Sequence, residues 1–485
     1  MNKRTATIVA ILTLGCSSLF AGGILTNTNQ SAHFIRMVAR DASTQIDAAY
    51  TNPAGLVKLE DGLHFSFTNQ SAFQTRTITS TFAPFAYNGG SATKEFKGTA
   101  SAPIIPSLQA AYKKGKWVLS GNIAVSGGGG KATFNDGLPS FEAGIAMLPL
   151  GITSLGSSLG AIIPGATLSS NQYSVDAYMT GSSFIYGLQM GGSYEINDMF
   201  SAYAGFRLNI VNNSYEGYLK NVKINPTSNI PVLGTGEMIS AVDYFNSLAQ
   251  NQALPAEYQA LAKNYATMVA DREIDNKQSG WGVNPILGLN FNHKGLNIGV
   301  KYEFKTSLDV ESKTIDGKDG GLSQFKDGVN TPHDIPALLT VGASYQILPN
   351  LSASVGYHHF FDSDADMGGK EKYINGGTNE YLFGAEYRIN NMFLVCAGGQ
   401  ITRYGVTDDY QKDLSFSINS YSIGLGGAVN VAKNVMINIG YFWTTYSDWT
   451  KKVDSYVSTS STAIGGTDVF SRTNKVFAAG VDFSF

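Results

Sequence analysis

The chain ends with the stretch Lys475-Val-Phe-Ala-Ala-Gly-Val-Asp-Phe-Ser-Phe485, and this stretch shows the pattern that is repeated along the chain. From Phe477 to Phe485 every second residue is apolar, and the residues between them are small or polar. A period of two is typical of a β-strand with one apolar face. We therefore expect the chain to end in such a strand, and we looked for the same pattern upstream.

Several upstream segments alternate in the same way, among them 296–305, 381–389 and 435–444. Their charged residues all fall on the face opposite to the apolar one. One strand of this kind does not distinguish a water-soluble sandwich from a membrane barrel, because both have one apolar face. The connections between the strands do make that distinction.

Short and long connections alternate along the chain. Six are short and polar, at residues 113–116, 195–198, 292–295, 349–350, 390–391 and 433–434. Seven are long, at approximately 76–100, 127–173, 213–278, 311–333, 362–377, 405–412 and 448–472. These connections imply fourteen strands with both ends of the chain on the short-turn side, as in barrels with brief periplasmic turns and long extracellular loops. We predict an all-β fold, a 14-stranded antiparallel transmembrane β-barrel over residues 62–485.

The first 21 residues have the three parts of a secretory signal peptide. A basic start (Lys3, Arg4) precedes an apolar stretch and a small-residue end at Ala21, where we expect cleavage. Beyond it, no stretch of about 20 unbroken apolar residues could form a transmembrane helix. The segment 143–166 comes closest, but prolines and glycines interrupt it and we interpret it as a loop.

Composition excludes several classes of protein. Removing Lys3 and Arg4 leaves 32 basic against 37 acidic side chains, so there is no basic field for nucleic acid. Only Cys396 remains after cleavage, which excludes an internal disulfide. His358 and His359 point to opposite faces of a strand, and the acidic run at 362–366 lacks the glycine and glutamate of a calcium loop. We expect no metal and no cofactor.

Fourteen strands enclose more space than the side chains of the wall can fill, so we expect residues 22–61 to form a plug, or hatch, inside the barrel. This segment contains Tyr50-Thr51-Asn52-Pro53-Ala54-Gly55-Leu56. Asn52-Pro53 favours extended or turn backbone, and Gly55 permits a tight reversal. The motif could thus wedge folded backbone against the wall.

A small-residue plug with an Asn-Pro-Ala motif, placed before fourteen strands, resembles the FadL family of long-chain fatty-acid transporters. The resemblance covers the mature chain in architecture, and its motif is Asn52, Pro53, Ala54 and Gly55. The segment 33–38 departs from the small residues typical of the family, so the family's plug contacts are not carried over. The final Phe485 resembles the signal that outer-membrane barrels present to their assembly machinery.

The resemblance implies a function. Such a protein would lie in the outer membrane of a Gram-negative bacterium as a monomer, among membrane lipids, and would transport hydrophobic small molecules. Its cargo would be captured at apolar outer loops, passed to a pocket in the barrel, and released sideways where the third strand kinks. The predicted third strand runs into Gly127, Gly128, Gly129 and Gly130, which are prone to bulge, and we assign the gap to them.

The loops supply candidate ligand-binding residues. Loop 213–278 contains two helical patterns, and loop 127–173 is apolar with few charges. From these loops we select Leu148, Leu150, Phe245, Leu248, Leu261 and Tyr265. The alternative is that the loops pack on each other as a lid, and the two interpretations are compatible.

A fatty-acid carboxylate would need a cationic partner in an apolar pocket. The candidates are Arg36 and Arg40 in the plug, and Arg207 and Lys305, which strand parity points inward. Lys301 and Arg388 share that parity. The alternative for each is an internal salt bridge, for which Glu303 and Glu386 have the correct parity.

Two other functions remain as alternatives. A general diffusion porin would keep an open, charged lumen, whereas this chain spends some 40 residues on a plug. An outer-membrane lipid hydrolase would need a nucleophile motif, and none accompanies the six histidines. We therefore expect a transporter, not an enzyme.

Overall fold

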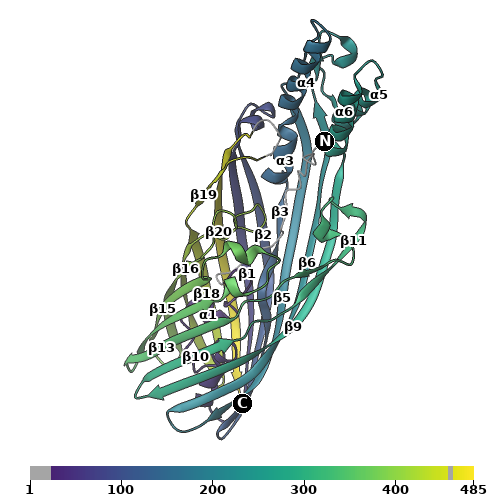
Figure 1. Ribbon diagram of the computed structural model, residues 1–485. Helices are drawn as coiled ribbons and strands as arrows, with labels where there is room; N and C mark the ends of the chain where they lie inside the picture. The colour runs from purple at the N-terminus through teal and green to yellow at the C-terminus, as the bar shows by residue number, and fades with distance from the viewer. Residues whose placement is uncertain (1–22, 457–462) are drawn as a thin grey trace.

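The computed structural model describes residues 23–456 and 463–485 and shows a closed antiparallel barrel (Figure 1). The predicted signal peptide lies outside the described residues. Fourteen strands form the wall of the described chain, and β1 closes the ring by pairing with β20. The predicted fold class is confirmed. In order around the wall the strands are β1 (Gly62–Thr81), β2 (Thr93–Lys114), β3 (Trp117–Phe134), β5 (Tyr173–Glu195), β6 (Phe200–Ile224), β9 (Arg272–His293), β10 (Leu296–Glu303), β13 (Leu338–Leu348), β14 (Leu351–Phe360), β15 (Thr378–Arg388), β16 (Phe393–Arg403), β17 (Ser420–Ala432), β18 (Val435–Tyr446) and β20 (Gly466–Ser484).

The two faces of the wall have opposite character. Outward side chains are apolar and exposed, such as Ile439 at 60%, while the neighbouring inward Asn438 is 0% exposed. A water-soluble protein buries its apolar face, so this inverted arrangement is that of a barrel in lipid. The alternation of inward and outward residues that the sequence predicts is present in the wall strands from β1 to β20.

All six predicted short turns join neighbouring strands at one end of the barrel, where β1 begins and β20 ends (Figure 1). Four of the seven long connections are shorter than predicted, because the strands continue into them, whereas those predicted at 311–333, 362–377 and 405–412 are longer. β1 and β2 stay paired up to Thr81 and Thr93, deep inside the predicted loop 76–100. Above the membrane the outward face of these strands is polar, while Ile78 and Phe96 are buried on the inner face, so the hydrogen-bonded ladder persists where the lipid-facing apolar pattern has ended.

Smaller elements extend the wall at the long-loop end. They are the strands β4 (Leu168–Ser169), β7 (Thr227–Ser228), β8 (Ile239–Ser240), β11 (Asp309–Asp319), β12 (Asn330–Pro332) and β19 (Trp449–Val453), and the 3-10 turns η2 (Ala83–Tyr87), η3 (Pro231–Leu233), η4 (Ser323–Phe325), η5 (Asp362–Asp364) and η6 (Lys370–Tyr373). The tall side of the barrel, formed by β2, β3, β5, β6 and β9, carries the loop helices (Figure 1).

The two helices predicted in loop 213–278 are present as α5 (Ala241–Gln250) and α6 (Ala256–Val269). The interpretation of 143–166 as an irregular loop is wrong: the region forms α3 (Pro139–Ala146) and α4 (Leu148–Ile162). Pro139 and Pro149 lie in first helical turns, where a missing N–H costs nothing. Gly156 allows α4 to approach the Leu168 backbone, since an added Cβ would overlap the Leu168 carbonyl oxygen.

The stretch Pro139–Gly160 has the length and composition of a membrane span, and half of it is buried within the protein. It stands on the long-loop end of the barrel, beside α5 and α6 (Figure 1). We therefore treat it as a pair of loop helices.

The N-terminal segment lies inside the barrel. It contains α1 (Ala32–Arg36), α2 (Ala48–Thr51) and η1 (Pro53–Lys58), and nearly all of its residues from 23 to 57 are buried. α1 packs against β17, β18 and β20, while η1 packs against β5, β6 and β9. The plug thus spans the lumen and contacts opposite sides of the wall.

Candidate transport pathway

The wall has a break between β2 and β3. Their pairing runs from Gly98↔Phe134 to Ser101↔Lys131, stops, and resumes only at Leu108↔Ile123. On the β3 side, bulges at Val125/Gly127 and Gly128/Gly130 also interrupt the register with β5. The predicted glycine run therefore lies at a real interruption of the ladder, with Gly128 at a positive φ of 65°.

Two prolines of β2, Pro103 and Pro106, lie within the same interruption. Proline has no N–H to donate, so it is tolerated only where a strand lacks a neighbour or bulges. The β1–β2 pairing shifts register between Gln70 and Ala72, opposite this segment. The sequence analysis identified the glycines and missed these prolines, which carry the second half of the signal.

The start of the plug lies across the inner side of this break. The Asn27 backbone N–H donates to the Ser126 carbonyl at 2.8 Å, and its amide Nδ2 donates to the Val125 carbonyl at 3.2 Å. A Cβ at Gly127 would overlap the Leu25 carbonyl oxygen. We call residues 25–27 the plug arm. It takes the hydrogen-bonding place of the missing strand neighbour and covers the opening from inside.

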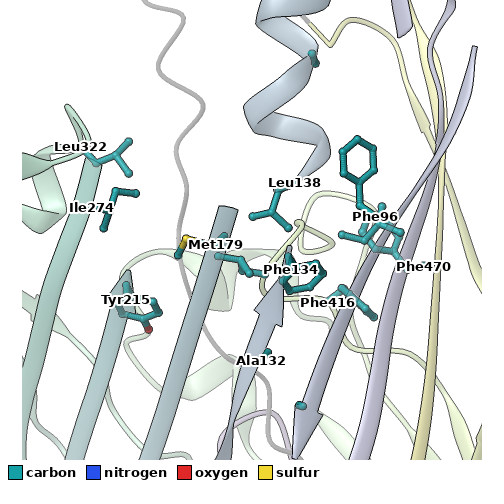
Figure 2. Packing of buried hydrophobic residues seen from close by; sticks show 14 of the residues in the cluster. Phe96, Ala132, Phe134, Leu138, Met179, Tyr215, Ile274, Leu322, Phe416 and Phe470 are labelled. Carbon is teal, nitrogen blue, oxygen red and sulfur yellow. The ribbon is translucent and has the colours of Figure 1, made fainter. Parts of the chain in front are cut away.

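An apolar cluster joins the break to the loop helices. It includes Ile105 and Val125 at the break, and Leu138, Leu148 and Phe245 from the loop helices and the turn that enters them. Figure 2 shows its middle, where Phe134 of β3 lies beside Phe416, Phe470 lies close by, and Leu138 lies at the foot of α3. The cluster thus connects the outer loops to the break through apolar contacts, and buried charged groups border it: Glu142 accepts from Tyr173, and the Arg76 guanidinium lies 4.4 Å from the centre of the Phe416 ring.

The plug motif contacts β5, β6 and β9, the strands that follow β3 around the wall. Asn52 donates to the Leu289 carbonyl at 3.0 Å, and Ser193 and Ser201 donate to the carbonyls of Pro53 and Ala54, each at 2.7 Å. At Gly55 an added Cβ would overlap the Ser43 carbonyl oxygen. The motif is therefore a tight reversal whose carbonyl groups are capped by wall hydroxyls.

Buried ion pairs hold the rest of the plug. Arg36 donates to Glu386 at 2.6 Å and to Asn438 at 3.1 Å, and Arg40 donates to Asp47 at 2.7 Å. These guanidinium groups are almost completely buried. Because a buried cation that loses its partner is strongly destabilising, the Arg36–Glu386 pair fixes the plug to the wall, whereas the Arg40–Asp47 pair stabilises the fold of the plug itself.

Two further polar clusters lie between the plug and the wall. Glu303 accepts from Arg207 at 2.5 Å and from Lys301 at 2.6 Å, and Lys301 also donates to the Tyr50 carbonyl at 2.9 Å. His358 lies between Asp41 of the plug and Glu380 of β15, at 2.8 Å from each. A hollow of about 10 Å³ lies between the clusters.

A buried carboxyl group marks the upper rim of the lumen. Asp362 in η5 accepts from the backbone N–H and the hydroxyl of Thr378, at 2.8 and 2.6 Å. Burial raises the pKa of Asp362 to about 7 in spite of these hydrogen bonds. Ile24, the second described residue, packs close by with Met367 and Val406, so the plug begins near this rim.

Comparison with known proteins supports one fold. No protein-family model and no curated protein matches the sequence. Among solved structures, a FadL homologue from Pseudomonas aeruginosa superposes with a TM-score of 0.61 at 13% identity, over 96% of this chain and 100% of that one. The chain has the FadL fold. The deltaS2S3 mutant of TodX, a monoaromatic hydrocarbon channel, superposes at 0.51 and 13% identity, over 94% of this chain and 99% of that one.

Within this FadL fold, three of the four basic candidates lie inside the barrel and are already paired. Arg36, Arg40 and Arg207 form the ion pairs described above. Lys305 lies beyond the end of β10, where it pairs with Asp334 at 2.7 Å and keeps 38% of its side chain exposed. A ligand carboxylate would have to displace an existing partner at each position. Arg388 lies exposed at the short-turn rim.

The apolar candidates divide into two groups. Leu148, Phe245 and Leu248 are buried in the apolar cluster, and Tyr265 stacks on Phe245 with ring centroids 5.0 Å apart. Leu150 is half-buried, whereas Leu261 is 41% exposed and lies outside the cluster. The structure therefore brings together the inner faces of α4, α5 and α6 but not the outer face of α6.

Proposed function

We propose that this chain is a FadL-type transporter of the Gram-negative outer membrane, which admits hydrophobic small molecules such as long-chain fatty acids. In this proposal residues 1–21 are a cleaved signal peptide, 22–61 the plug and 62–485 the barrel. It acts as a monomer, and its terminal Phe485, 70% exposed, is available to the assembly machinery.

The break between β2 and β3 is the observation that carries the proposal. A hydrophobic molecule gains free energy by entering the membrane directly and loses it by crossing water, so a sideways exit suits such cargo. The apolar cluster extends from the loop helices to the break, and its apolar side chains suit hydrophobic cargo. Cargo would be captured at α4 and α5, pass through the cluster and leave at the break.

The plug arm is the gate in this proposal. It covers the break through the two hydrogen bonds of Asn27. Each of these bonds contributes only about 1 kcal/mol, so little free energy is needed to break them. The rest of the plug is held to the wall by the Arg36–Glu386 ion pair and by the contact between Asp41 and His358. We therefore expect the arm to move while the body of the plug stays in place.

A reversible cross-link tests the gate. In a Cys396→Ala background, Asn27→Cys with Ser126→Cys would join the arm to β3, because the backbone hydrogen bond holds the two residues within disulfide reach. Uptake of radiolabelled oleate should stop under oxidising conditions and return after reduction. The control Ala54→Cys with Ser201→Cys joins the plug motif to the wall instead and should leave uptake unchanged.

The result also separates the proposal from the porin alternative. A general diffusion porin would pass small polar solutes through its lumen, whatever the position of the arm. Oleate uptake that continues at the wild-type rate with the arm locked would contradict lateral release, and cargo would then have to pass through a rearranged plug near Arg36 and Arg40.

A further inference from the structure

The outer face of the barrel is hollowed at the extracellular end of the break. The hollow has a volume of about 540 Å³ and is formed by β20, β1, β2 and β3. One row of outward residues crosses it in direct register, namely Lys475, Phe73, Ser101 and Lys131. Ser101↔Lys131 is also the last pair before the β2–β3 ladder stops. The hollow therefore adjoins the upper rim of the break.

Its chemistry is that of a site for an anion. Lys131 and Lys475 stand at its two ends, and none of the residues that line it is acidic. In the described parts of the chain, 23–456 and 463–485, neither ammonium group has an ion-pair partner. The hollow thus presents two uncompensated positive charges toward the outside.

Hydroxyl groups complete the surface. The next row toward the extracellular side consists of Thr473, Thr75, Thr99 and Thr133. The Thr75 and Thr473 hydroxyl oxygens lie 2.7 Å apart, so one donates to the other and leaves a hydrogen to donate outward. Hydroxyl donors beside two ammonium groups suit phosphate oxygens.

The height of the hollow points to a lipid headgroup. Phe73 lies 11 residues above Gly62 on β1, and a strand tilted by about 40° rises about 28 Å over that length. The apolar band of such a barrel is about 25 Å tall, so the lysines lie just above its upper edge. Below them Phe477 and Ile104 are apolar and exposed at 52% and 75%, and on β1 Phe67, exposed at 53%, follows below the outward Ser71 and Asn69.

We propose that this hollow binds a phosphate-bearing lipid of the outer leaflet. Its phosphate lies between Lys131 and Lys475 with the threonine hydroxyls above, and its acyl chains extend downward over Phe477 and Ile104. A small anion would use only the upper half of this surface, whereas a lipid uses both halves. The bound lipid lies along the rim of the β2–β3 break, at the place where released cargo would meet the membrane.

Binding can be measured without transport. The full mature chain in detergent is titrated with diphosphoryl lipid A, and bound lipid is counted by native mass spectrometry. Each lysine near a charged headgroup strengthens binding by about fivefold, so Lys131→Gln with Lys475→Gln should weaken binding by about thirtyfold. The matched control is Lys277→Gln with Lys313→Gln, an exposed, directly paired couple in the same row further around the barrel, which should bind as wild type.

Two comparisons decide the outcome. Lipid A without its phosphates should bind as weakly to the wild type as intact lipid A binds to the double variant. An equal loss of lipid A binding in both double variants would show diffuse attraction to the protein surface and overturn the proposed site. Undiminished binding of the dephosphorylated lipid would overturn it as well. Competition by millimolar inorganic phosphate alone would show a simple anion site and overturn the lipid proposal. None of these results depends on the transport mechanism.

Discussion

Removing the charge of Glu303 should loosen the plug. Glu303 neutralises both Arg207 and Lys301, whose side chains are only 4% and 1% exposed. Glu303→Gln leaves two buried cations with one neutral acceptor, and breaking a buried pair in this way costs about 3–5 kcal/mol. Because displacement of the plug lets water reach Lys301, part of that cost favours the displaced state. If about 3 kcal/mol is relieved in this way, the displaced population rises by about a hundredfold.

Single-channel recording in planar bilayers measures that population as the open probability. The matched control is Glu195→Gln, which removes the partner of Lys58 at 3.3 Å in a half-exposed pair near the short-turn rim. Exposed pairs contribute little, so this variant should behave as wild type. If Glu303→Gln opens no more often than Glu195→Gln, the ion-pair clusters do not hold the plug in place, and the argument built on them is refuted.

Three further predictions address the topology and the loops. A tag near Asn390 should be inaccessible on intact cells and a tag near Asp364 accessible, because they lie at the short-turn and long-loop ends; labelling at Asn390 would reverse the topology. Burial raises the pKa of Asp413 to about 6, so the folded loop binds a proton more tightly than the unfolded loop and is more stable at pH 4 than at pH 7. Asp413→Asn keeps an acceptor for the Ser140 N–H, which lies 2.9 Å from the Asp413 carboxylate. This variant should therefore increase the amide-exchange protection of α3 at pH 7 by up to about 3 kcal/mol and leave it unchanged at pH 4. An equal effect at both pH values would contradict the titration of Asp413. Phe245→Ala should lower the stability of the loop helices by about 3–5 kcal/mol and increase their rate of proteolysis. Leu261→Ala, at an exposed position, should do neither. Similar rates of proteolysis for the two variants would disprove the packing role of Phe245.

The sequence was sufficient for the wall because a membrane barrel repeats one simple rule. Lipid outside and polar groups inside force neighbours such as Ile439 and Asn438 to differ, and this contrast is visible at every second residue. The six short turns follow from the same pattern. Where the wall rises above the membrane its outward residues become polar, and the end of β1 was therefore placed too early and the start of β2 too late.

The site was only partly predictable, because it depends on contacts between distant residues. Strand parity placed Glu386 on the inner face, but its partner Arg36 is 350 positions away and meets it only through the path of the plug. The glycine run indicated one side of the break, while the plug arm across it carries no motif. Residues 25–27 became identifiable only when the structure placed Asn27 against Ser126.

The central claim is that cargo leaves through the wall between β2 and β3. Its most direct test is a photoreactive benzoylphenylalanine at Ile104, which faces the membrane beside the break at 75% exposure, compared with the same group at Ile439 on β18, which is 60% exposed. During uptake of radiolabelled oleate, illumination should cross-link oleate to the photoreactive group at position 104 and so make the chain radioactive. This labelling should stop when the disulfide of the Asn27→Cys, Ser126→Cys variant is closed. Equal labelling at positions 104 and 439, unaffected by that disulfide, would contradict lateral release at the break.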